Sequence, residues 1–283
     1  MRSDTLRALP LMLLAMALIP AGDTAGKLLT GGEGVAPLWV AFSRFALGAV
    51  ILAPFVLHIT PPRIFLDWRI WLRTLFIAGG IVSILTALRT EPIANVFGAF
   101  FVGPILSWLL SVWLLREGFS LPRLGLVCVG FLGVILVVKP GFGMTPGLGF
   151  AVLAGIFYGA FLTASRWLAG VARPRALLMS QLVIGALVLA PLGLPQTPEI
   201  TARVGWLTLA SALGSMLGNL CLILALRMAP ASRLAPFVYT QLIAATSLGW
   251  LVFGVWPDAL AFAGLVILLV SGLASLGLRE RAG

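Results

Sequence analysis

The chain has 283 residues, of which 60% are hydrophobic and 10% charged, and its mean hydropathy is +1.10. A soluble domain of this length needs far more charge to cover its surface, so the composition excludes an ordinary soluble protein. The net charge of +10 does not indicate a nucleic-acid partner, because the basic residues lie in short segments between apolar runs.

Ten apolar runs approach the ~20 residues that a helix needs to cross a bilayer. The connections between them are a few residues long, which leaves no room for a soluble catalytic domain. We therefore predict an all-α membrane protein with ten transmembrane helices. They are expected at residues 9–29, 37–58, 69–88, 93–115, 121–138, 147–168, 175–194, 204–226, 233–254 and 257–277.

The first run has a second interpretation. Arg2 and Arg7, the apolar residues 9–20 and the small residues 21–25 resemble a cleaved signal peptide, whose removal would leave nine helices. However, residues 15–27 align at an offset of 139 with residues 154–166, and both segments are rich in small residues and end in a cation. The first run is therefore predicted to be a permanent span.

The Lys and Arg residues are distributed unevenly over the two sides of the predicted topology. With the N-terminus in the cytoplasm, 14 of the 19 fall on the cytoplasmic side, 4 on the opposite side, and Arg44 lies within a helix. This is the asymmetry that the positive-inside rule describes. We expect a multi-pass protein of the cell inner (plasma) membrane, of bacterial type, with both termini cytoplasmic.

The sequence also contains a weak internal repeat. Leu88-Arg89-Thr90-Glu91-Pro92 recurs as Leu226-Arg227-Met228-Ala229-Pro230, and Gly125 and Gly133 match Gly264 and Gly272 at an offset of 139. The repeat predicts two five-helix units, residues 1–143 and 144–283. Because five is odd, the second unit enters from the opposite side, so the repeat is inverted and typical of alternating-access transporters. A static structural protein or a channel can also retain such a duplication.

The two halves together resemble a known family. The run Leu88–Lys139, with Pro104 and Arg116-Glu117, and the matching run Leu226–Gly272 are similar to the drug/metabolite transporter superfamily, specifically its EamA-type members. The second half departs from the pattern, since Trp256-Pro257-Asp258 stands where the first half has Glu117.

The resemblance implies an exporter of amino acids, aromatic or apolar, and of similar small metabolites. It implies a central cavity lined by the first, third, fourth, sixth, eighth and ninth helices. The fifth and tenth helices are expected to pack the halves together, and their glycines permit close backbone approach. These glycines are Gly125, Gly130, Gly133, Gly264 and Gly272.

Aromatic and neutral polar residues at mid-membrane depth are the candidate substrate ligands. Phe97, Phe100, Phe101 and Pro104 follow the i, i+3, i+4, i+7 spacing of one helical face, and Pro104 deprives the Phe100 carbonyl of its usual partner. The Phe side chains alternatively face lipid, and the polar groups alternatively bond between helices. The candidate set is Asn95, Phe97, Phe100, Phe101, Tyr158, Asn219, Tyr239 and Gln241.

Charged residues inside spans are costly and are functional by default. Asp23 and Arg44 lie at similar depth, so we expect a structural ion pair between them, with Lys27 also near Asp23 on the same helix. The alternative is a proton-coupled exporter of lipophilic cations or drugs that uses Asp23. Pro20, beside Gly22 and Gly26, is a candidate for a gating hinge.

An intramembrane enzyme is the main different class, and the sequence gives no support for one. The single histidine, His58, lies in a predicted loop, and no two acidic residues lie together in the membrane. Cys128 and Cys221 are isolated in apolar runs. We expect no cofactor and no metal; the partners are a small-molecule substrate and the lipid bilayer.

Overall fold

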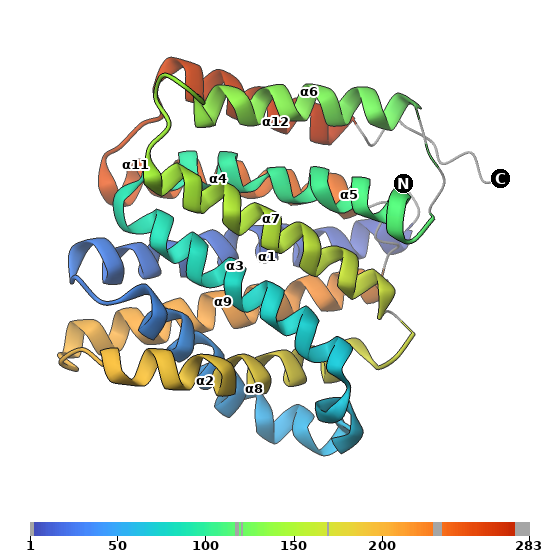
Figure 1. The fold of residues 1–283 in the computed structure, drawn as a ribbon, viewed down its shortest axis with the longest axis vertical. Coiled ribbons are helices and arrows are strands. Elements are labelled where there is room, and N and C mark those ends of the chain that lie inside the picture. The colour runs from blue at the N-terminus through green and yellow to red at the C-terminus, as the bar shows by residue number, and fades with distance from the viewer. Residues whose placement is uncertain (1–2, 117–118, 120, 169, 229–233, 275–283) are drawn as a thin grey trace.

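The computed structural model describes residues 3–116, 119, 121–168, 170–228 and 234–274, and within this part of the chain all regular structure is helical. Figure 1 shows the helices lying side by side along a common direction, as expected of a membrane-spanning bundle. Eight helical segments are long and apolar enough to cross a bilayer, and the last two, Phe237–Phe253 and Ala259–Ala274, are shorter. Together they form the predicted ten-helix fold.

The helix bounds agree with the predicted spans to within a few residues at most ends. In the first half the helices are α1 (Ser3–Lys27), α2 (Pro37–Val56), α3 (Trp68–Thr90), α4 (Ile93–Phe100), α5 (Val102–Leu114) and α6 (Leu121–Val138). In the second half they are α7 (Pro146–Trp167), α8 (Pro174–Gly193), α9 (Ala202–Met228), α11 (Thr240–Phe253) and α12 (Ala259–Ala274).

Three spans depart from a single regular helix. The fourth is broken at Phe101 into α4 and α5, three residues before Pro104. The first begins six residues earlier than predicted and ends in a π-helical turn, η1 (Leu28–Gly32). The ninth begins with a 3-10 segment, η5 (Ala235–Tyr239). Glu117 and the Ala229-Pro230 end of the repeat motif lie outside the described residues.

The bundle has two ends, which we name by the helix termini that they contain. The amino-terminal face holds the start of α1 and the end of α12. The Lys27 face holds the end of α1, the end of α3 and the starts of α4, α7 and α9 (Figure 1). At the Lys27 face, Asp258 caps α12 by accepting hydrogen bonds from the Leu260 and Ala261 amides, and it also pairs with Lys139 after α6.

Helix packing is unchanged when the two halves are exchanged. The exchange maps α1, α2 and α3 onto α7, α8 and α9, the fourth span onto the ninth, and α6 onto α12. The pairs α1–α9 and α3–α7 interchange, while α2–α8 and α6–α12 each map onto themselves, and all four pairs are packed. A duplicated fold with a two-fold axis in the membrane plane has this property.

The fifth and tenth spans pack together as expected. A Cβ atom on Gly133 would lie 2.8 Å from the Gly264 carbonyl oxygen, and one on Gly264 would lie 2.6 Å from the Gly133 carbonyl oxygen. Gly130 faces the Ser271 hydroxyl, and Gly272 faces the Tyr239 ring. Gly125 was wrongly included in this set, because nothing lies within 4 Å of its Cβ position.

Candidate functional site

A central cavity lies between the two halves, deep within the bundle. The space between its lining atoms is about 890 Å³, a figure that includes the opening to the surroundings. Side chains from α1, α2, α3, α4, α7, α8, α9 and α11 line it, so both halves contribute. The second and seventh spans, α2 and α8, were not expected among the lining helices. The polar residues that line the cavity are Asp23, Arg44, Tyr158, Gln181, Ser215, Asn219 and Gln241.

Asp23 and Arg44 form the predicted ion pair at one side of this cavity. The Arg44 Nη1 atom lies 2.6 Å from Asp23 Oδ1, and both residues are only 5% exposed. Arg44 Nε donates to the Ser211 hydroxyl at 2.8 Å, and Nη2 donates to the Gly22 carbonyl at 3.0 Å. One guanidinium therefore connects α1, α2 and α9. The ion pair contributes the only charged groups among the described residues that line the cavity.

Amide side chains form a second polar group in the cavity. Gln181 on α8 and Gln241 on α11 are each 5% exposed, and neither amide has a hydrogen-bond partner among the described residues. The Asn219 amide donates to the Ser215 carbonyl at 2.8 Å, which leaves its oxygen as an acceptor. Neither amide is among the fully buried polar atoms that lack a partner, so both remain accessible from the cavity and can bind a polar ligand.

Two aromatic rings from different spans form the apolar wall. The centroids of the Phe100 and Tyr158 rings are 4.8 Å apart, with an angle of 38° between their planes. Both residues line the cavity. The Phe100 carbonyl oxygen, which Pro104 leaves without its helical partner, lies against α7, 2.5 Å from the position of a Cβ on Gly155. The freed carbonyl is therefore packed against protein.

The structure places half of the eight candidate ligands in the cavity: Phe100, Tyr158, Asn219 and Gln241. It places Phe97 and Phe101 in the core at 0% and 1% exposure. Tyr239 packs on the Phe101 ring at 4.8 Å between centroids and on Gly272. Asn95 does not line the cavity, and its buried Oδ1 has no partner among the described residues.

The two prolines have different surroundings. Pro104 lies in α5, one turn after the break at Phe101. Pro20 lies inside α1, which continues from Ser3 to Lys27 without a break, and its carbonyl accepts a hydrogen bond from the Thr24 hydroxyl. The sequence-based site omitted Gln181, although a Gln within an apolar run is the same signal that identified Gln241.

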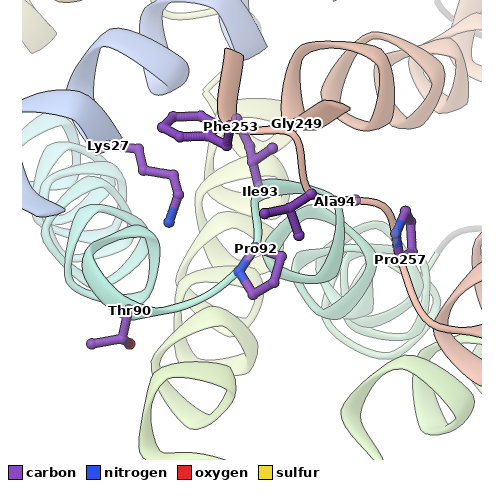
Figure 2. A pocket seen from close by; sticks show the side chains of 9 residues that line it. Lys27, Thr90, Pro92, Ile93, Ala94, Gly249, Phe253 and Pro257 are labelled. Carbon is purple, nitrogen blue, oxygen red and sulfur yellow. The ribbon is translucent and has the colours of Figure 1, made fainter. Parts of the chain in front are cut away.

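Lys27 lies in a second pocket, at the Lys27 face, and does not pair with Asp23. Figure 2 shows its side chain extending from α1 toward the corner between Thr90 and Pro92, with the Phe253 ring beside it. The ammonium donates to the Leu88 carbonyl at 2.8 Å and the Glu91 carbonyl at 2.7 Å, and lies 5.3 Å from the Phe253 ring centroid. It therefore joins α1 to the corner between α3 and α4 and contacts α11.

The two faces of the bundle are not equally packed. At the Lys27 face α1 packs against α3, since a Cβ on Gly31 would lie 2.9 Å from the Arg89 carbonyl oxygen. Exchange of the halves relates this pair to α7 and α9, whose described residues make at most isolated contacts with each other. The structure is thus closed at the Lys27 face, whereas the described residues of α7 and α9 do not form the equivalent closure at the amino-terminal face.

Comparison with protein families gives one match that covers nearly the whole chain. The model of the EamA-like transporter family matches residues 6–139 and residues 145–276. A crystal structure of a protein with 20% sequence identity has a TM-score of 0.65 and is matched over 96% of each chain. At this level of identity the second comparison concerns the fold alone.

Curated relatives are found in Rickettsia. The S-adenosylmethionine uptake transporter of Rickettsia conorii is 27% identical over 272 residues, which is 92% of this chain and 89% of the relative. The S-adenosylmethionine uptake transporter of Rickettsia bellii is also 27% identical, over 92% of this chain and 90% of the relative.

Proposed function

Because the chain belongs to the EamA-like transporter family, we propose that it carries a small zwitterion with an aromatic or nucleoside tail across the bilayer. The observation that supports this class is the cavity, which combines one ion pair, buried amides and two aromatic rings. A zwitterion brings charges of both signs, and a flat tail brings a surface that aromatic rings bind well.

S-adenosylmethionine is the first substrate to test. It joins an amino-acid head to an adenosyl group, and the curated relatives are named for its uptake. The Gln181 and Gln241 amides offer donors and acceptors for the edge of a purine, and the Phe100 and Tyr158 rings offer faces for stacking. Aromatic amino acids have the same head and a smaller tail, so export of these remains the second candidate.

The proposed mechanism is alternating access between two inverted five-helix units, residues 1–143 and 144–283. Two halves of the same fold can exchange conformations, which turns a cavity open to one side into one open to the other. We assign the amino-terminal face to the cytoplasm of a bacterial-type inner membrane on the basis of the Lys and Arg distribution. The structure then corresponds to the state closed toward the outside.

A proton-coupled exporter of lipophilic cations remains the alternative function. It is favoured by the position of Asp23 beside the cavity. It uses the Asp23 carboxylate alone and gives no role to the Arg44 cation that donates a hydrogen bond to it. The zwitterion proposal uses both charges of the pair and is therefore preferred.

The test is counterflow in proteoliposomes that contain the full-length protein. Vesicles loaded with unlabelled S-adenosylmethionine, phenylalanine, tryptophan, methionine or tetraphenylphosphonium are diluted into the same compound in labelled form. The proposal predicts transient accumulation of a zwitterion and saturation with concentration, which also separates a carrier from a channel. Accumulation of tetraphenylphosphonium alone, driven by a pH gradient, would contradict it.

A further inference from the structure

We infer that the Asp23–Arg44 pair is a binding subsite for the α-amino and α-carboxylate groups of the substrate, which enter by separating the two side chains. Arg44 takes the carboxylate and Asp23 takes the ammonium group. The inference rests on the proposed function and adds to it the residues that select the head of the substrate.

The hydrogen-bonding capacity of the pair is only partly used. A guanidinium has five N–H donors in a planar fork, which suits a carboxylate held by two parallel bonds. Arg44 uses three of these donors, on Asp23, Ser211 and the Gly22 carbonyl. Asp23 accepts through Oδ1, and its Oδ2 has no partner among the described residues. Donors and an acceptor therefore remain for a ligand in the cavity that both residues line.

The scaffold itself does not require the pair. The repeat offset of 139 relates Asp23 to Leu162 and Arg44 to Val183, which are both apolar. The second half forms the equivalent helices without any charge at these positions, and α8 packs against α3 as α2 packs against α9. A buried ion pair also gives little net stability, because removing two charges from water offsets much of their attraction. A ligand explains why both charges are kept in one half only.

The cavity has a charged part, which suits the head of the substrate, and a neutral part, which suits its tail. Gln181 and Gln241 are neutral, and Phe100 and Tyr158 contribute aromatic faces. These groups suit the tail of the substrate, whereas the two charges suit only its head. The subsite predicts that any accepted tail must be attached to a head that carries both an ammonium and a carboxylate group.

The experiment measures binding to purified full-length protein through the ligand-induced rise in melting temperature. The probes are two matched series. One consists of S-adenosylmethionine, decarboxylated S-adenosylmethionine and methylthioadenosine; the other consists of phenylalanine, phenethylamine and phenylpropionate. In the wild type we expect the compound with the complete head to bind at least about tenfold more tightly than the others of its series.

The double variant Asp23→Asn/Arg44→Gln tests the assignment without leaving a single buried charge. Replacing both partners by neutral groups is commonly tolerated, whereas removing one is strongly destabilising. We expect this variant to fold and to lose the preference for the complete head. The control is the double variant Glu33→Gln/Arg203→Gln. It removes an ion pair with an N–O distance of 2.8 Å that lies outside the cavity, and it should keep the preference for the complete head.

The outcomes separate the two proposals. Suppose that phenylalanine binds more tightly than phenethylamine and phenylpropionate, but S-adenosylmethionine does not bind. The subsite is then supported, and S-adenosylmethionine is not the substrate. If the double variant folds and binds every probe as the wild type does, the subsite is wrong, whichever substrate is carried. If the double variant is unfolded, Arg44→Lys provides the readout, because it keeps the charge but cannot form the two parallel bonds; an unchanged preference would then also refute the subsite.

Discussion

The Lys27 ammonium donates a hydrogen bond to the Leu88 carbonyl at 2.8 Å, so the end of α1 is fastened to the last turn of α3. No equivalent packing joins α7 to α9 along the part of the chain that the structure describes. Lys27 therefore stabilises closure at one face only, and its removal should shift the protein toward the state open at that face.

Lys27→Met tests this role, because methionine keeps much of the length but has no donors. In a background with Cys128→Ser and Cys221→Ser, a single Ser215→Cys places a thiol in the cavity. We expect a membrane-impermeant maleimide applied at the Lys27 face to react about tenfold faster in Lys27→Met, since a hydrogen bond to a charged group contributes about 1.5–3 kcal/mol. Lys27→Arg keeps the donors and is the control; equal rates in all three proteins would contradict the prediction.

Gln181 and Gln241 should affect binding and stability in opposite directions. Each amide faces the cavity without a hydrogen bond to another described residue, so an apolar side chain of similar size removes no interaction that stabilises the fold. Gln181→Leu and Gln241→Leu should therefore melt at or above the wild-type temperature and bind the substrate more weakly. Asn95→Leu is the matched control, because the Asn95 amide lies outside the cavity and its buried oxygen has no partner among the described residues. If Asn95→Leu also lost substrate binding, the effect of the Gln variants would not depend on their position in the cavity.

The contact between α6 and α12 depends on two small residues. In Gly264→Val the new side chain would begin 2.6 Å from the Gly133 carbonyl oxygen, so the helices must separate. Overpacking of this kind costs about 1–3 kcal/mol. We expect a lower melting temperature in detergent. Gly125→Val, in α6 but with nothing within 4 Å, should leave the melting temperature nearly unchanged. A similar loss in both variants would show that helix propensity, not the contact, is responsible.

Asp258 should make the stability of the Lys27 face depend on pH. Its pKa is lowered, chiefly by the hydrogen bond from Lys139 and by the capping bond from the Ala261 amide. The stabilisation is therefore complete above the pKa of an unfolded Asp, about 3.9, and is lost as the pH falls through the lower folded value. Since the side chain is 51% exposed, the effect should stay below about 1 kcal/mol.

The measurement for Asp258 is the melting temperature between pH 3 and 7. The wild type should have a higher melting temperature than Asp258→Asn at neutral pH, and this difference should disappear toward pH 3. Asp258→Ala also removes the cap of α12 and should melt lower still, by about 1 kcal/mol in stability. If the difference in melting temperature between the wild type and Asp258→Asn increased on acidification, the prediction would be wrong.

The spans and the ion pair were predictable from the sequence for definite physical reasons. Apolar runs of bilayer length with few charges are stable as membrane-spanning helices, so the ten helices could be predicted from composition. Asp23 and Arg44 were predictable because a lone charge in a membrane is costly and each was the other's available partner. Neither prediction depends on the detailed path of the backbone.

The candidate site was predicted less well, because it depends on how particular helices bend. The spacing of Phe97, Phe100 and Phe101 assumes a straight fourth helix, but α4 ends at Phe100 and the chain restarts as α5. Only Phe100 then reaches the cavity. Tyr239 ends a 3-10 segment, where residues follow a tighter turn than in an α-helix, and its ring packs on Gly272 instead.

The single ion pair in the cavity also determines what the membrane potential can do. Asp23 and Arg44 are the only charged residues among the described ones that line the cavity, and their charges cancel, so the loaded cavity carries the net charge of its substrate. A neutral amino acid would cross without electrical work. S-adenosylmethionine, with its sulfonium, is a monocation, and an inside-negative potential would favour its entry by about 2.3 kcal/mol per 100 mV, roughly fifty-fold in concentration. For such a substrate, accumulation would require no coupling ion.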